Sequence, residues 1–357
     1  MENKEKFVKG IFLLLMFVAV LFAGALLKVM ESVFKPLVLS IMLSFVFYPF
    51  IKKLSTKYKM PWWLATTLVY LFSLVNVFLL ANVLSVSFKS ALLSIPKYEE
   101  KFLNLYQIFL QWLQKDTSLY SMFGFDQKAS LFANLNSQFN ILEIAKDAAL
   151  GFTGSVVGFM KVFFLVLLMS VFLLAEFKQM KEKVGRAFDT EGEVKVYAMI
   201  QKIVADVTHY ISIKFLISLA TGVLVFLVCL VFRMDFPLVW GFAAFCLNFI
   251  PTFGSIISCV ITALFAIIQF YPSFWSAFFV IVLIVAINII LGNIVEPKIE
   301  GDNLGVSTFV ILVSISFWGW LWGIIGLIIA VPFVVIIRII CENVSYLKPI
   351  GVFLGSK

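Results

Sequence analysis

A chain of 357 residues in which 62% are hydrophobic and only 13% are charged lacks the polar side chains that a water-soluble surface needs. The formal net charge is +8, but the basic residues lie mainly in short connections between apolar runs, which is typical of membrane topology signals and not of nucleic-acid binding. The composition therefore excludes a soluble globule and predicts a multi-pass membrane protein.

Residues 1–88 predict three transmembrane helices, because a helix needs about 20 apolar residues to cross roughly 30 Å of hydrocarbon. The loop after the second apolar run carries four lysines and no acid. The positive-inside rule places this loop and the N-terminus in the cytoplasm, so we expect an inner-membrane protein. The three apolar runs are residues 11–27, 36–51 and 64–86.

Residues 89–150 form the longest stretch without a span, and span parity places them outside the cytoplasm. Large apolar side chains recur there at helical spacing, which predicts an amphipathic helical insertion. Such a stripe packs on neighbouring helices or on a second subunit of a homo-oligomer, or it lies on the membrane surface; packing is favoured. The stripe consists of Tyr98, Phe102, Leu105, Phe109 and Trp112.

The second half of the chain contains the predicted transport core. A fourth span, residues 151–175, returns the chain to a cytoplasmic segment, residues 176–209, which carries six basic and six acidic residues. Residues 210–342 are predicted to form the transmembrane core, which includes a regular span at residues 274–295. Residues 343–357 are then a cytoplasmic tail.

Two apolar blocks of the core are interrupted. Residues 236–270 are broken near Pro251, which removes a helix donor, and Gly254, which permits a turn. Residues 306–340 are divided by the tryptophans and glycines of residues 318–323. We therefore expect an all-α polytopic membrane protein with about eight transmembrane segments, including two short-armed broken hairpins that enter the membrane from opposite faces.

Interrupted helices of this kind are typical of a transport pathway, because irregular backbone at membrane depth is tolerated only inside protein or beside water. The alternative is that the proline only kinks a helix and the glycines allow close helix packing. On the first interpretation the residues expected along the substrate pathway are Asn248, Pro251, Gly254, Asn288, Asn293, Glu296, Pro297 and Gly301.

Ionisable side chains in or beside the spans are candidates for ion coupling. Glu296, at the inner end of a span, and Asp235 are the two candidates, and for Glu296 an exposed anchoring role at the inner interface is favoured. Lys161 and Lys214 lie near span ends, so snorkelling or helix–helix hydrogen bonding is favoured over a transport role.

Enzymatic readings find little support in the sequence. The chain has one histidine, no Walker sequence and no cysteine–histidine spacing for a metal. We therefore expect no catalytic residues, no cofactor and no metal. The expected partners are membrane lipid and a small-molecule or ion substrate, and no nucleic acid.

Three motifs follow one another in the core: an Ile-Pro-x-x-Gly break at residues 250–254, a Pro-x-x-x-Gly loop at residues 297–301 and a Gly-x-x-Gly-x-x-x-Ala-x-Pro helix at residues 323–332. This ordered set resembles the autoinducer-2 exporter family of bacterial permeases, and the order of spans fits along the whole chain. The chain departs from the family pattern at Ser307 and Thr308, where members commonly have a proline.

The resemblance implies an ATP-independent permease. Members of the family are associated with export of the quorum signal autoinducer-2, and some with sodium(lithium)/proton antiport. The scarcity of carboxylates within the predicted spans favours export of a small polar solute, with the antiporter as the alternative. A third alternative is a non-transporting membrane scaffold that gathers partners through residues 89–150.

Overall fold

The computed structural model describes residues 11, 14–15, 18–19, 22–94, 97–98, 101, 104–105, 141–187, 190–251, 253–300 and 305–355. Seven helices among these residues are long and apolar enough to cross a membrane, so the predicted all-α polytopic membrane fold is confirmed. The chain divides into two compact units: unit 1 is Met1–Leu71, Val162–Ser212 and Glu300–Lys357, and unit 2 is Phe72–Lys161 and Ile213–Ile299.

Four long helices contain the predicted second, third and fourth spans and the first part of the predicted core. They are α2 (Glu31–Lys57), α3 (Trp62–Leu93), α7 (Ile141–Ala187) and α8 (Thr190–Val231). The ends of α7 and α8 extend well beyond the apolar runs, into the charge-balanced residues 176–209. This segment, which we expect in the cytoplasm, therefore continues two membrane helices and is not a loop.

Most of the predicted insertion, including its stripe positions Phe102, Phe109 and Trp112, lies outside the described residues. The first expected span, residues 11–27, is described only in part. Of the insertion's stripe, Tyr98 and Leu105 are described and lie in helical turns.

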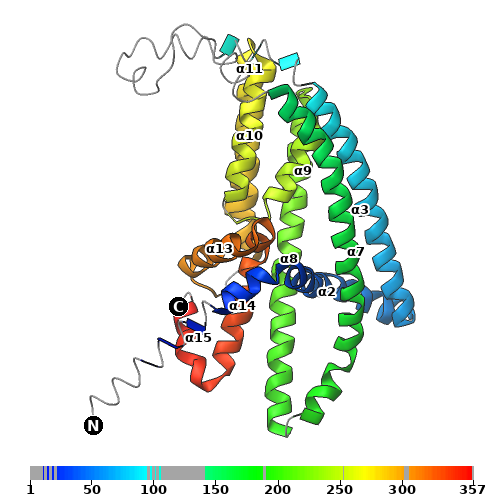
Figure 1. Ribbon diagram of the computed structural model, residues 1–357, viewed down its shortest axis with the longest axis vertical. Coiled ribbons are helices and arrows are strands. Elements are labelled where there is room, and N and C mark those ends of the chain that lie inside the picture. Colours follow the sequence, from blue (N-terminus) through cyan, green and yellow to red (C-terminus); the bar gives the residue numbers. More distant parts are fainter. Residues whose placement is uncertain are drawn as a thin grey trace. The chain divides into compact units, whose positions relative to one another are not determined.

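Both predicted helix breaks are confirmed (Figure 1). The first separates α9 (Pro237–Leu247) from α10 (Phe253–Phe270), and the second separates α13 (Thr308–Trp322) from α14 (Ile324–Asn343) at Gly323, whose φ of 65° suits a glycine. The first helix of each hairpin is short, with 11 residues in α9 and 15 in α13. The second helix is longer, with 18 residues in α10 and 20 in α14. The membrane face from which each hairpin enters stays a prediction.

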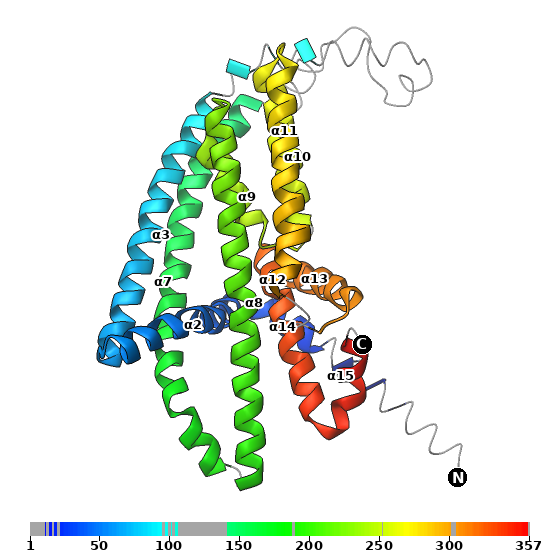
Figure 2. The same ribbon diagram turned by 180° about the vertical axis from the view of Figure 1, so that it is seen from behind.

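The span predicted at residues 274–295 changes its helix type midway. It begins as α11 (Phe274–Asn288), continues as the π-helix η1 (Ile289–Val295) and ends in α12 (Glu296–Glu300). In both ribbon views α10 and α11 run side by side as a pair (Figures 1 and 2). A seven-residue π-helix is rare, and such segments occur frequently at functional sites.

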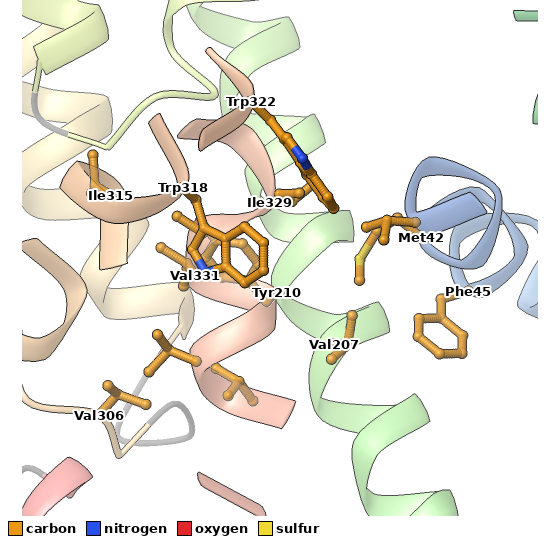
Figure 3. Close-up of a cluster of buried hydrophobic side chains, with 14 of the residues drawn as sticks. Met42, Phe45, Val207, Tyr210, Val306, Ile315, Trp318, Trp322, Ile329 and Val331 are labelled. Atoms are coloured by element: carbon orange, nitrogen blue, oxygen red, sulfur yellow. The ribbon is translucent and has the colours of Figure 1, made fainter. Parts of the chain in front are cut away.

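Unit 1 is organised around a buried aromatic and aliphatic cluster, shown in Figure 3. Trp318 of α13 stacks on Phe333 of α14 with 4.3 Å between ring centroids, and the Trp322 indole N–H donates to the Leu27 carbonyl at 3.1 Å. Large buried aromatic rings contribute strongly to packing and fix the α13–α14 hairpin against its neighbours. The other labelled members of the cluster are Met42, Phe45, Val207, Tyr210, Val306, Ile315, Ile329 and Val331.

Buried hydroxyl groups also connect α2, α3 and α7 within unit 1. The Ser44 and Ser170 hydroxyls are 2.7 Å apart, and the Tyr70 hydroxyl hydrogen-bonds to Ser170. Hydroxyls that bond across helices are a common form of association between membrane spans. This network therefore joins three apolar helices whose other contacts are mainly dispersion.

The predicted cytoplasmic tail is folded. After the 3-10 turn Ser345–Leu347, helix α15 (Lys348–Leu354) packs on α14. The Ser307 N–H donates to the Leu354 carbonyl at 2.9 Å, and Val306 forms an isolated bridge with Gly355. A proline at position 307 would lack the N–H that makes this bond, so the chain's departure from the family pattern at Ser307 has a structural use.

Candidate functional site

A stripe of buried polar side chains runs along α8 in unit 2. Lys214, Ser218 and Thr221 have exposed fractions of only 5%, 0% and 1%. Their spacing of four and then three residues places them on one face of the helix. Polar groups in an apolar setting are costly unless they are hydrogen-bonded, so the partners of this stripe define the site.

The Lys214 ammonium is paired with the Glu296 carboxylate at a distance of 2.5 Å. The exposed fractions of the two side chains are 6% and 13%. Glu296 is the first residue of α12 and directly follows the π-helix η1. The expectation that Glu296 is an exposed anchor is therefore wrong, because its carboxylate is largely removed from solvent and neutralised by a lysine. Of the two roles expected for Lys214, helix–helix hydrogen bonding is found and snorkelling is not.

One helical turn further along α8, the Asn248 amide donates to the Ser218 hydroxyl at 3.0 Å. Asn248 follows the last residue of α9 and is 5% exposed. Since four residues of α-helix rise about 6 Å, the ion pair and the amide–hydroxyl pair lie one above the other on α8. We call these four side chains, Lys214, Ser218, Asn248 and Glu296, the polar column.

The helix break beside the polar column depends on a glycine. A Cβ added to Gly254 would lie 1.7 Å from the Leu247 carbonyl oxygen, so only glycine allows α10 to begin this close to the end of α9. Pro251 is half-buried in the intervening turn. One turn after Gly254, the buried Ser258 hydroxyl has no hydrogen-bond partner among the described residues. The geometry favours a packing role for Gly254.

The remaining predicted pathway residues lie elsewhere. The Asn288 amide donates to the Cys259 sulfur and to the Ile284 carbonyl, each at 3.0 Å, and so connects α11 with α10. Asn293 and Pro297 are exposed, and Gly301 lies outside the described residues. Of the predicted residues that the structure describes, Asn248 and Glu296 thus bond to side chains on the polar face of α8.

Asp235, the second candidate for ion coupling, lies between α8 and α9. Its carboxylate accepts hydrogen bonds from Lys97 at 2.7 Å and from the Tyr98 hydroxyl, and its N–H donates to the Gln269 side chain at 2.8 Å. Burial raises the pKa of Asp235, but these two hydrogen bonds and the charges of Lys97 and Lys101 together hold it below its ordinary value. This arrangement favours a structural role for Asp235 at the base of the α9–α10 hairpin.

The sequence predicted a helix–helix hydrogen bond as one of two roles for Lys214 but not its partner Glu296, and Ser218 was not predicted. The available signal was the spacing of Lys214, Ser218 and Thr221 within an apolar run, which marks a polar face. Among the described residues no group of three or more histidine, cysteine, aspartate or glutamate side chains could hold a metal ion. What the polar column offers is an ammonium, a carboxylate, a hydroxyl and an amide, which suits binding by hydrogen bonds.

Comparisons with known proteins find one family model and several relatives that are named as transport proteins. The family model described as "AI-2E family transporter" matches residues 11–345. A candidate transport protein of Borreliella burgdorferi is 33% identical over 339 residues, which cover 95% of this chain and 89% of that protein. A candidate transport protein of Haemophilus influenzae is 30% identical over 341 residues, 95% of this chain and 94% of that one. The AI-2 transport protein TqsA of Escherichia coli is 35% identical over 193 residues, 54% of this chain and 55% of TqsA.

Proposed function

Because the chain belongs to the AI-2E transporter family, we propose that it is an ATP-independent permease of the inner membrane that exports a small polar solute such as autoinducer-2. The observation that carries this proposal is the polar column, a set of buried hydrogen-bonding side chains within helices that are otherwise apolar. Intramembrane polar residues are costly and are found mainly where they serve a pathway.

The column has the chemistry that a solute rich in hydroxyl and carbonyl groups would need. Lys214 and the Asn248 amide can donate hydrogen bonds, Glu296 can accept them, and Ser218 can do both. Because a hydrogen bond within the protein can be exchanged for one to a solute at small net cost, such a solute can replace the Asn248–Ser218 bond.

The proposed cargo and the orientation in the membrane rest on separate observations. The name of the Escherichia coli relative states AI-2 transport, and that relative matches about half of the chain. Orientation with both termini in the cytoplasm follows from the four lysines of the loop at residues 52–59 and from span parity. The relative's name supports autoinducer-2 as the cargo. Export is proposed because members of the family are associated with export of this signal.

One observation favours a second candidate, sodium(lithium)/proton antiport. Glu296 is a carboxylate within the core, and an antiporter needs such a group to carry the proton and the cation in turn. In the described structure the place of the cation is taken by the Lys214 ammonium, which is why we rank this candidate second.

The proposal is tested by measuring autoinducer-2 inside and outside cells of a deletion strain. The strain is complemented with the wild type, with Asn248→Ala, or with Ser314→Ala as a control for loss of a hydrogen bond away from the column. We expect the deletion strain to retain the signal, Ser314→Ala to restore its release and Asn248→Ala to restore little. Unchanged distribution in the deletion strain would refute the proposed cargo. Sodium-dependent proton flux in membrane vesicles would instead support the antiporter.

A further inference from the structure

We infer that the Lys214–Glu296 pair keeps the route electrically neutral, so that it admits uncharged polar solutes and zwitterions and rejects solutes with a net charge. This inference rests on the proposed function, because it assumes that the polar column lines the solute's route. It concerns the charge class of the cargo, which the family membership leaves open.

The fixed charges of the polar column sum to zero. Lys214 contributes one positive charge and Glu296 one negative charge, and their nearest charged atoms are 2.5 Å apart. The other two members, Ser218 and Asn248, are neutral, as is the buried Thr221 one turn further along the same face. A solute at this position therefore meets hydrogen-bonding groups but no unbalanced charge.

Burial makes this neutrality selective. The two charged side chains are only 6% and 13% exposed, so water cannot compensate either charge if the pair is separated. A sodium ion that binds Glu296 must displace the Lys214 ammonium, which is then left unpaired in an apolar setting. An anion that binds Lys214 displaces the Glu296 carboxylate, which is then left unpaired in an apolar setting. Removing one partner of a buried ion pair is strongly unfavourable, and each net-charged solute meets this penalty.

Two solute classes avoid the penalty. An uncharged polyol or carbonyl compound can bond to Ser218 and Asn248 while the ion pair stays closed. A zwitterion can place its carboxylate on Lys214 and its ammonium on Glu296, so that both protein charges stay compensated when the pair opens. The arrangement thus selects on net charge, and hydrogen bonding decides among the solutes that pass.

The test uses purified full-length protein in liposomes, with uptake of radioactive sodium and chloride measured under a potassium–valinomycin voltage clamp. The wild type should take up neither ion faster than protein-free liposomes. Glu296→Gln leaves Lys214 unpaired, so chloride uptake should rise about fivefold or more while sodium uptake does not. Lys214→Gln leaves Glu296 unpaired and should raise sodium uptake by a similar factor without raising chloride uptake.

The exchanged variant K214E/E296K should reject both ions again, because the pair is restored with its charges reversed. If the single variants run as monodisperse protein but show no opposite ion preference, the pair is only structural and the inference is wrong. If the single variants fail to fold, the inference is tested on the wild-type protein alone. Sodium or chloride uptake by wild-type liposomes above that of protein-free liposomes would overturn it.

Efflux of autoinducer-2 from the same liposomes separates this inference from the proposed cargo. If the wild type releases autoinducer-2 while the single variants show no ion preference, the neutral-route inference fails and the permease proposal stands. If the single variants show opposite ion preferences and autoinducer-2 does not move, the route is supported and the proposed cargo is wrong.

Discussion

The two broken hairpins share one backbone feature and differ in what they bury. A Cβ at Gly254 would lie 1.7 Å from the Leu247 carbonyl oxygen, and a Cβ at Gly326 would lie 1.8 Å from the Trp318 carbonyl oxygen. In each hairpin the second helix therefore crosses the end of the first at a distance that only glycine permits. Beside the first crossing the chain buries an amide, Asn248, and beside the second it buries stacked aromatic rings.

This difference separates close packing from function. The rings and aliphatic side chains around α13 and α14 interlock, and moving them would forfeit many dispersion contacts. The polar side chains beside α9 hold one another by single hydrogen bonds, which a solute can replace. A glycine crossing thus indicates a tight hairpin, and the side chains next to it decide whether the hairpin is a rigid core or a binding site.

The largest loss of stability is expected when the glycine at either helix crossing is replaced. Gly254→Ala and Gly326→Ala each force a methyl group into a backbone carbonyl, which should cost about 3 kcal/mol or more and sharply lower the amount of folded protein in the membrane. Thermal unfolding in detergent and membrane abundance measure this. Gly158→Ala is the control, because nothing lies within 4 Å of the added atom. Wild-type abundance of Gly254→Ala with lost transport would show instead that Gly254 lines the route.

Replacing one carboxylate in each unit should destabilise the two units to different degrees. Glu296→Gln leaves the buried Lys214 ammonium without its partner and should cost about 3 kcal/mol of stability. Glu342→Gln in α14 loses more exposed contacts to Arg338 and Lys202 and should cost less than about 1 kcal/mol. The free energy of unfolding in detergent compares them. Equal costs would mean that the Lys214–Glu296 pair is no more important to the fold than a surface network.

Single hydrogen bonds beside the two crossings allow a closer comparison. Asn248→Ala removes the bond to Ser218, and Ser314→Ala removes a bond of 2.9 Å to the Ala330 carbonyl. Each should cost about 1 kcal/mol of stability. Only Asn248→Ala should also lower transport per folded molecule, by about tenfold. Similar transport losses in the two variants would remove the functional distinction between the hairpins.

The smallest effect at neutral pH concerns the base of the α9–α10 hairpin. The pKa of Asp235 is lower in the folded protein than its ordinary value, so its charged form stabilises the fold. This contribution is present above the ordinary carboxyl pKa of about 3.9 and is lost as the pH falls through the lower folded value. Melting temperatures between neutral pH and about pH 3 should therefore fall more steeply for the wild type than for Asp235→Asn. Parallel curves would contradict the role given to Asp235.

The spans and both helix breaks could be predicted from the sequence because their signals are local. Apolar length indicates a span, and Pro251, Gly254 and Gly323 mark the places where a helix cannot continue. The change to π-helix at Ile289–Val295 could not be predicted, because hydropathy indicates the length of a span and not its type of helix. The fold of the tail onto α14 was likewise not predicted, because helix α15 has only seven residues.

The site could be predicted only in part. Asn248 and Glu296 are recognisable as polar residues at the ends of apolar runs, but Lys214 is 82 residues from Glu296, and its pairing depends on which face of α8 meets α12. The sequence predicted snorkelling or helix–helix hydrogen bonding for Lys214, and the second of these is found, but the spacing could not name Glu296 as the partner. Partner choice in the polar column is thus a property of tertiary structure.

The π-helix before Glu296 sets the direction of the Glu296 side chain. In that segment the count of residues matters more for this direction than the type of each residue. In an α-helix each residue turns the chain by about 100°, so the loss of one residue between Ile289 and Val295 would rotate the Glu296 side chain by roughly that angle, away from Lys214. Exchanging one exposed aliphatic side chain for another in the same stretch would leave the direction of Glu296 unchanged. Among homologous chains, the residue types of η1 should therefore vary, whereas the number of residues in η1 should stay the same.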